Sequence, residues 1–233
     1  MIRIFAQWQD KIVLNANDQH HLVNVLRVQQ GEAIELLING IVYLGKVVNT
    51  KPLQIERLHV IDERHELPFQ ITLIYPVVKG EKMDWVVQKA TELGVYELIP
   101  CQSERSIVHW DRNDLDKKIN RYQRIIDEAT LQSKRESVMK MDRYLPLAEA
   151  LKLNYDSKWI ASESHLTSWL PSSLQFKKNS SISLVVGPEG GFSIGELEQA
   201  QLHGYQVFSL GPTILRSETA VVTALSMLRE RGF

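Results

Sequence analysis

Two glycine-rich stretches in the C-terminal third of the chain carry residue types suited to holding a small ligand. The first, Gly-Pro-Glu-Gly-Gly-Phe-Ser at 187–193, follows a β-branched run and precedes a helix-like segment. Backbone amides in such a strand–turn–helix commonly bind phosphate. This stretch lacks the Lys-Ser/Thr pair of a phosphate loop, and the carboxylate of Glu189 would repel an anion at the helix start. It therefore favours a neutral or partly cationic ligand; the alternative is a tight structural turn.

The second stretch, at 210–220, reads Leu-Gly-Pro-Thr-Ile-Leu-Arg-Ser-Glu-Thr-Ala and also follows an apolar run. Gly-Pro makes a turn, Ser217 is placed to cap a following helix, and Glu218 lies at the end of that helix where the dipole favours an acidic residue. Arg216 stands beside Glu218, between two apolar stretches. Either these two side chains act on a ligand, or they form an ion pair that closes the end of a core helix.

The elements that would position these loops change character along the chain. The first part is rich in β-branched residues, and Asn39-Gly40 between two apolar runs predicts a β-hairpin. Strands are expected at 2–5, 12–14, 33–38, 41–48 and 53–60, with one short helix after Asp18. Residues 61–70 are polar and contain a proline, which indicates a linker. Residues 1–70 are therefore expected to form a small β-barrel.

From residue 71 onward, strands and helices alternate. Strands are expected at 71–75, 96–99, 159–161, 182–186 and 207–210, and helices at 82–93, from 114, after Ser193 and at 220–228. Ser193 and Glu196 form a capping box, and Gly94 stands where a helix C-terminus favours glycine. Such alternation predicts an α/β domain with a mostly parallel sheet, which binds ligands at the carboxyl ends of its strands. Because 220–228 is apolar on nearly all sides, it is expected to be buried in the domain or between subunits.

The composition sets bounds on the class of protein. The 233 residues are 44% hydrophobic and 24% charged, which is ordinary for a globular protein with one large domain or two modest ones. A single cysteine, Cys101, excludes an internal disulfide and suits a reducing cytosol. No histidine spacing indicates a metal site, no apolar run reaches the ~18 residues of a membrane span, and the N-terminus lacks the apolar core of a signal peptide. The protein is therefore expected to be cytoplasmic, with no metal and no membrane association. The net charge of −1 argues against a strongly basic nucleic-acid binder but leaves room for a local basic patch.

Taken together, the motifs resemble those of a known family. The stretch GPEGGFS with Glu196 after it, and LGP-x-ILR-x-ETA downstream, are similar to the two signature loops of the bacterial 16S rRNA uridine N3-methyltransferase family, known as RsmE. The resemblance extends over the whole chain. It includes HHLVNVLRVQQG at 20–31, KGEKMDWVVQKATELGV at 79–95, SERS at 103–106 and RIIDEATLQSKR at 124–135. Thr213 departs from the pattern, since the family often has arginine there, and Ser217 stands where threonine is common.

The resemblance implies a fold and a cofactor. It implies a PUA-like β-barrel at 1–70 that helps hold RNA, and a SPOUT methyltransferase domain at 71–233 that ends in a trefoil knot and pairs as a homodimer. The methyl donor would be S-adenosylmethionine, and the substrate 16S rRNA, within the small ribosomal subunit. Donor-binding residues implied by the family are Glu163, Gly187, Pro188, Glu189, Gly190, Gly191, Leu210, Gly211, Ile214 and Leu215. Glu189 then suits a cationic sulfonium.

The same resemblance assigns chemistry to the second loop. N3 of uridine carries a proton and lies on the Watson–Crick edge, so the base must be unpaired and the nitrogen made nucleophilic. Arg216 would stabilise negative charge on a uracil carbonyl, and Glu218 would either orient Arg216 or accept the proton. Candidate RNA contacts are Arg27, Lys79, Lys82, Lys89, Arg105, Arg124 and Arg135, for which an ordinary solvated surface is the alternative. Two rival functions stay open, a SPOUT methyltransferase for another RNA nucleotide and an RNA-binding module without catalysis.

Overall fold

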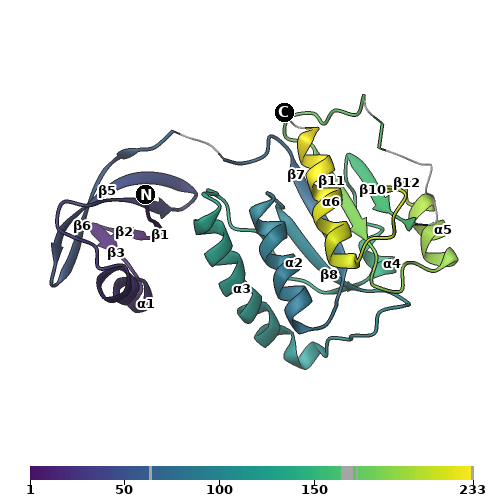
Figure 1. The fold of residues 1–233 in the computed structure, drawn as a ribbon, viewed down its shortest axis with the longest axis horizontal. Coiled ribbons are helices and arrows are strands. Elements are labelled where there is room, and N and C mark those ends of the chain that lie inside the picture. The colour runs from purple at the N-terminus through teal and green to yellow at the C-terminus, as the bar shows by residue number, and fades with distance from the viewer. Residues whose placement is uncertain (63–64, 164–169, 172, 232–233) are drawn as a thin grey trace. The chain divides into compact units, whose positions relative to one another are not determined.

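The protein is described by a computed structural model that covers residues 1–62, 65–163, 170–171 and 173–231 (Figure 1). The described chain forms two compact units. One comprises Met1–Glu66 together with Thr130–Ser137, and the other comprises Leu67–Ala129 and the chain from Val138 onward. The N-terminal unit thus includes a segment that is distant in sequence, which the expected boundary at residue 70 did not include.

The N-terminal unit is built on a four-stranded sheet in the order β1-β4-β5-β6. The strands are β1 (Arg3–Phe5), β4 (Ala33–Ile38), β5 (Ile41–Thr50) and β6 (Leu53–Val60); a separate hairpin contains β2 (Gln7–Gln9) and β3 (Lys11–Val13). A short helix α1 (Ala16–His20) continues as the π-helix η1 (His21–Val25). Asn39 and Gly40 both have positive φ and join β4 to β5, as the hairpin prediction required. Asn15, rather than Asp18, caps α1.

The segment Thr130–Ser137 is held in this unit by charged groups. The Nε of Arg3 donates to Glu35 Oε2 at 2.6 Å, and the Nζ of Lys134 donates to the same oxygen at 3.0 Å. Arg135 is 2% exposed and its Nη2 lies 3.1 Å from Glu66 Oε2. Arg3 and Glu35 are 32 positions apart, Lys134 and Glu35 are 99 apart, and Arg135 and Glu66 are 69 apart, so no local pattern could indicate these contacts.

The other unit contains a six-stranded sheet in the order β12-β10-β11-β7-β8-β9, with every neighbouring pair parallel. Its strands are β7 (Gln70–Pro76), β8 (Glu97–Gln102), β9 (Leu145–Pro146), β10 (Ser157–Ala161), β11 (Ser181–Val186) and β12 (Gln206–Phe208). Its helical segments are α2 (Gly80–Glu92), η2 (Arg112–Asp114), α3 (Leu115–Gln132, of which the part to Ala129 belongs to this unit), α4 (Leu147–Ala150), α5 (Ile194–Leu202) and α6 (Ser217–Glu230). The predicted α/β domain with a parallel sheet is confirmed; the short β9 and α4 were not predicted.

Alternation along the strands places helices on both faces of the sheet. Leu73 and Tyr75 of β7 pack in one core with residues of α2, α3 and α6, whereas Ile74 packs on the opposite face with residues of α4 and α5. Figure 1 shows α2 and α6 side by side on the first of these faces. The apolar helix α6 buries Val221, Leu225 and other side chains there, as its composition predicted.

The register of the central strands brings the two glycine-rich loops to one edge of the sheet. Ala161 of β10 pairs with Val186 of β11 and with Phe208 of β12. All three strands end at these residues and are parallel, so the segments that follow them leave from the same edge of the sheet. Among the residues that the structure describes, no helix is long and apolar enough to cross a membrane.

Candidate functional site

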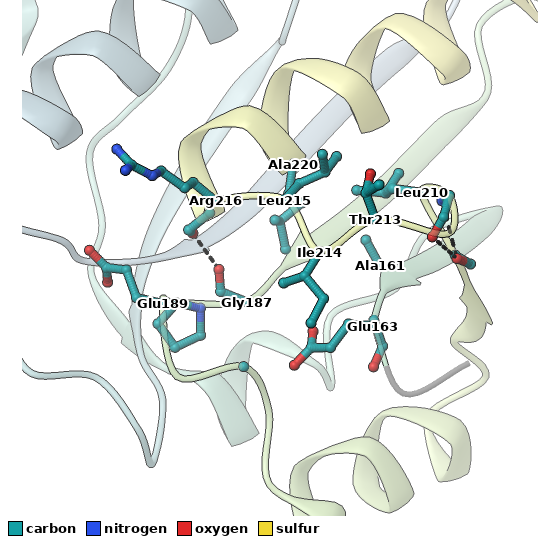
Figure 2. A pocket seen from close by; sticks show the side chains of 17 residues that line it. Ala161, Glu163, Gly187, Glu189, Leu210, Thr213, Ile214, Leu215, Arg216 and Ala220 are labelled. Atoms are coloured by element: carbon teal, nitrogen blue, oxygen red, sulfur yellow. Dashed lines mark hydrogen bonds between the residues drawn. The ribbon is translucent and has the colours of Figure 1, made fainter. Parts of the chain in front are cut away.

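A pocket of about 280 Å³ lies at the carboxyl ends of β10, β11 and β12 (Figure 2). Its lining comes from the ends of these strands, from the segments after them and from the start of α6. The lining residues are Ala161, Ser162, Glu163, Val186, Gly187, Pro188, Glu189, Gly191, Ser209, Leu210, Gly211, Thr213, Ile214, Leu215, Arg216, Ser217 and Ala220. Every residue that the sequence assigned to donor binding is in this set except Gly190. Seven lining residues were not assigned to the site: Ala161, Ser162, Val186, Ser209, Thr213, Ser217 and Ala220. Their position at or near the ends of β10, β11 and β12, or within the second loop, was the signal that could have indicated them.

Three glycines of the first loop pack closely against neighbouring side chains. Gly191 has φ +65°, and a Cβ there would overlap the carboxylate of Glu163. A Cβ on Gly190 would lie 3.2 Å from Cβ of Arg105, and one on Gly187 would lie 3.2 Å from the ring of Phe192. The loop is therefore tightly packed against its neighbours, which a side chain at these positions would disturb.

The exit of this loop is pinned by Glu196. The Ser193 hydroxyl accepts from the backbone N–H of Glu196, and the Glu196 carboxylate accepts from the backbone N–H of Ser193, which confirms the predicted capping box. The other carboxylate oxygen accepts from the backbone N–H of Glu104 at 2.8 Å. Arg105 then donates to the carbonyl of Gly190 at 3.0 Å. The loop after β8 thus supports the glycine loop from outside the pocket.

Ser217 has a different role from the predicted one. Arg216 occupies the N-cap position of α6 and makes no side-chain capping bond, so the expectation that Ser217 caps the helix was wrong. Instead, the Ser217 hydroxyl donates to the carbonyl of Gly187 at 2.5 Å and lies 2.8 Å from the Tyr75 hydroxyl. Burial raises the pKa of the Tyr75 phenol, so Tyr75 keeps its proton and donates to Ser217. These bonds join β7, the first loop and the start of α6.

Charged side chains from three elements meet at one side of the pocket. Lys82 of α2 donates to Glu189 Oε1 at 2.8 Å, and its Nζ lies 3.9 Å from Glu218 Oε2. The hydrogen bond from Lys82 lowers the pKa of Glu189, which therefore stays ionised near neutral pH. In Figure 2 the side chains of Glu189 and Arg216 extend to the same side, away from Ile214 and Glu163.

The alternative interpretation, an ion pair between Arg216 and Glu218, is not found among the described residues. Among the described residues Glu218 forms a salt bridge with Lys82 at 3.9 Å, and its Oε2 atom is buried without a hydrogen-bond partner. Arg216 is exposed. The interpretation of these residues as an ion pair that closes a core helix therefore loses its support.

The pocket suits a ligand with a flat apolar part and a positive charge. Ala161, Val186, Leu210 and Leu215 supply apolar walls, and the Glu163 carboxylate lies against Gly191. Within the described ranges, the acidic, His and Cys side chains form no group of three that could hold a metal ion. S-adenosylmethionine combines an adenine ring with a cationic sulfur, and these residues fit it.

The predicted RNA contacts lie in different environments. Arg27, Lys79, Arg105 and Arg124 are exposed. Lys82 and Lys89 are partly buried and paired with Glu189 and Glu92, respectively. The prediction for Arg135 was wrong, because its buried guanidinium is bonded to Glu66 and does not face solvent. The sequence pattern placed Arg135 beyond the end of a polar helix face, but the turn after α3 directs it inward.

Comparison with known proteins identifies the family. Residues 65–229 match the family described as the RNA methyltransferase domain, and residues 14–56 match the RNA methyltransferase PUA domain. Ribosomal RNA small subunit methyltransferase E of Bacillus subtilis (strain 168) is 32% identical over 227 residues, which is 92% of this chain and 88% of that protein.

Solved structures agree over nearly the whole chain. A ribosomal RNA small subunit methyltransferase E from Neisseria gonorrhoeae, bound to S-adenosyl methionine, has a TM-score of 0.86 at 31% identity and covers 99% of this chain and 97% of that one. A methyltransferase from Legionella pneumophila, solved with its cofactor SAM, has a TM-score of 0.87 at 30% identity, with 98% and 97% covered. The chain therefore belongs to the ribosomal RNA small subunit methyltransferase E family, with a PUA-like N-terminal domain and an α/β methyltransferase domain.

Proposed function

We propose that this protein transfers a methyl group from S-adenosylmethionine to N3 of a uridine in 16S rRNA. The observation that carries the proposal is the pocket at the carboxyl edge of the parallel sheet, with a carboxylate inside and a charged cluster at one side. Its relatives are small subunit rRNA methyltransferases, and two similar structures hold S-adenosylmethionine.

The residues that line the pocket, together with Glu218 beside it, divide into a donor side and an acceptor side. S-adenosylmethionine supplies an electrophilic methyl group on a positively charged sulfur. Glu163 and the loops at 187–191 and 210–215 would hold the donor, with the apolar walls around its ring. Arg216 would stabilise the negative charge that develops on a uracil carbonyl as N3 loses its proton. Because Glu218 does not pair with Arg216 among the described residues and its side chain is 17% exposed, it is better suited to accept that proton than to orient the arginine.

The proposal also includes the location, the oligomeric state and the substrate particle that the family implies. The protein would act in the cytoplasm as a homodimer on rRNA within the small ribosomal subunit. The partly buried Val222 on α6 would supply an apolar contact for a second subunit. The segment 209–216 would form part of the trefoil knot of the SPOUT class, and the bond from Ser217 to Gly187 supports its passage beside the first loop. Sedimentation equilibrium tests the dimer.

Nucleoside mass spectrometry of 16S rRNA from a deletion strain tests the reaction. Loss of N3-methyluridine in that strain, and its return with the wild-type gene but not with Arg216→Ala, is the expected result. Loss of a different methylated nucleoside would indicate the rival methyltransferase activity. An unchanged rRNA, together with no heat of binding for S-adenosylmethionine in calorimetry, would indicate a non-catalytic RNA-binding module.

A further inference from the structure

Lys82 occupies a position that helix stability does not explain. It lies in the first turn of α2, which begins at Gly80. A cation is unfavourable at that end, because the helix dipole places partial positive charge there. Its charge is instead compensated from two other elements, by Glu189 of the first loop and Glu218 of α6. The position of Lys82 therefore points to a role at the pocket.

The hydrogen-bonding capacity of this cluster is not fully used. An ammonium has three N–H donors, and among the described residues Lys82 donates to Glu189 alone. The 3.9 Å between Nζ and Glu218 Oε2 exceeds a hydrogen bond, and that oxygen is buried without a hydrogen-bond partner. Arg216, two positions before Glu218, adds donors from an exposed guanidinium that forms no ion pair within the described part of the chain. The cluster thus offers free donors on two cationic side chains, and a carboxylate, Glu218, whose side chain is 17% exposed.

This set complements one edge of uracil. The Watson–Crick edge of uracil presents a carbonyl oxygen, the N3–H group and a second carbonyl oxygen. Cytosine lacks the proton on N3 and has an amino group in place of one carbonyl. A site with a hydrogen-bond donor, an acceptor and a second donor in that order therefore matches the Watson–Crick edge of uracil. Bound cytosine would leave polar groups of the site and of the base without hydrogen bonds, and this cost discriminates uracil from cytosine.

Building on the proposed function, we infer that Lys82, Glu218 and Arg216 form the acceptor subsite and select uracil. Lys82 donates to one carbonyl oxygen, Glu218 accepts from N3–H, and Arg216 donates to the other carbonyl oxygen. Glu189 is a positioning residue, since its bond to Lys82 holds the ammonium in place. In the reaction the N3 proton passes to Glu218, the bond from N3 to the methyl carbon forms, and the electron pair of the breaking carbon–sulfur bond returns to sulfur.

Lys82→Met, which keeps most of the unbranched side chain and removes its charge, is the principal test. We expect a single-turnover methylation rate about 10²–10³-fold lower than that of the wild type, the usual effect of losing one positioned donor. The affinity for S-adenosylmethionine, measured by calorimetry, should stay unchanged. Lys82→Arg should recover part of the rate, because it keeps the charge but changes the geometry. Glu189→Gln, which loosens Lys82, should lower the rate less than Lys82→Met does.

RNA binding without the donor supplies a readout that does not depend on turnover. Two fragments that differ only by uridine or cytidine at the target position are titrated against each variant. The wild type should bind the uridine fragment more tightly than the cytidine fragment. Lys82→Met and Glu218→Gln should reduce the ratio of the two affinities. Arg143→Met is the matched control. It removes a cation from an equally close ion pair with Glu97, at the opposite end of the sheet, and should change neither rate nor preference.

Three results would overturn the inference. Weaker donor binding in Lys82→Met would show that Lys82 holds the glycine loop closed. A normal rate and preference with a reduced salt dependence of RNA binding would make it a phosphate contact. A normal rate, preference and salt dependence would leave Lys82 without a functional role. If the wild-type enzyme methylates no uridine at all, the proposed function itself fails, and this outcome is distinct from a normal rate in Lys82→Met.

Discussion

Arg216 is a residue whose effect on catalysis can be measured separately from its effect on substrate binding. Its guanidinium is exposed at the pocket and does not pair with Glu218 among the described residues, so it is available to a substrate. The charge on which it would act develops only as N3 loses its proton. Loss of this side chain should therefore reduce turnover more than substrate binding.

The expected effect of Arg216→Ala is a single-turnover rate about 10²–10³-fold below the wild type. Arg216→Lys should recover only part of the rate, because lysine keeps the charge but not the planar fork. Raising the pH should partly rescue Arg216→Ala, since more uracil is then ionised without help. The measurement is methylation of an RNA fragment across a pH series, and a normal rate in Arg216→Ala would place the catalytic group elsewhere.

Gly191 is a second residue whose replacement should change function, in this case the binding of S-adenosylmethionine. In Gly191→Val, the new Cβ would overlap the Glu163 carboxylate, and a β-branched residue would be strained at φ +65°. We expect binding of S-adenosylmethionine to be lost in a folded protein, as measured by calorimetry. Gly204→Val is the matched control, because Gly204 also has positive φ, but a Cβ at that position would have no neighbour within 4 Å. Equal donor affinity in the two variants would reduce the glycine loop to a structural turn.

At the scale of elements, the start of α6 is joined to the sheet by one hydroxyl. Ser217 links the carbonyl of Gly187 to the Tyr75 hydroxyl inside the core. Removing it in Ser217→Ala leaves two buried polar groups without this partner, which should lower the free energy of unfolding by about 1–3 kcal/mol. Urea denaturation measures this, with Ser217→Thr as the variant that keeps the hydroxyl. If the urea midpoint of Ser217→Ala equals that of the wild type, water replaces the hydrogen bonds that the Ser217 hydroxyl makes.

The exposed face of α3 supports a second prediction at this scale. Arg124 is exposed on that helix, opposite the buried Ile126. If it contacts one phosphate, Arg124→Ala should reduce the slope of log affinity against log salt concentration by about 1, with donor affinity unchanged. Lys158→Ala, on β10, should leave the slope as it is. An identical slope for Arg124→Ala and the wild type would make this face plain solvent-exposed surface.

At the scale of the whole molecule, Arg135 holds a distant segment in the N-terminal unit. Its guanidinium is 2% exposed and bonded to Glu66, whose side chain is 28% exposed. Burial alone would raise the pKa of Glu66, but Arg135 and the hydrogen bonds from Ser137 lower it overall. Ionised Glu66 therefore stabilises the fold above its ordinary pKa, and this contribution is lost as the pH falls through the lowered value.

Arg135→Met should accordingly lower stability instead of weakening RNA binding. Loss of one partner of a buried ion pair costs about 3–5 kcal/mol, and the partial exposure of Glu66 reduces the expectation to about 2 kcal/mol. Without Arg135, burial should raise the pKa of Glu66, so acid unfolding should begin at a higher pH than in the wild type. Thermal unfolding across a pH series measures both effects. A reduced salt slope of RNA binding with wild-type stability would restore the RNA-contact interpretation of Arg135.

Local patterns account for what the sequence predicted correctly. The Asn39-Gly40 hairpin, the Ser193–Glu196 capping box and the parallel sheet depend on residues within a few positions of one another, or on strand and helix periodicity. The two glycine loops follow strands in the sequence, and parallel strands bring their carboxyl ends to one edge. The pocket was predictable for that reason. The short β2, β9 and α4 were missed because two to four residues carry no periodic signal.

The sequence by itself determined the family, the α/β class and the two glycine-rich loops that supply most of the pocket lining, because those depend on motifs and on local chain geometry. Only the tertiary structure decided which charges meet. Lys82 and Glu189 are 107 positions apart, and Arg135 and Glu66 are 69 apart. Their pairing results from how the helices and loops pack, which no spacing in the sequence encodes. Lys82 and Arg135 were both predicted to contact RNA. In the structure Lys82 pairs with Glu189 at the pocket, and Arg135 is buried against Glu66. Which charges pair depends on their distance in the folded protein, because the Coulomb interaction falls with distance.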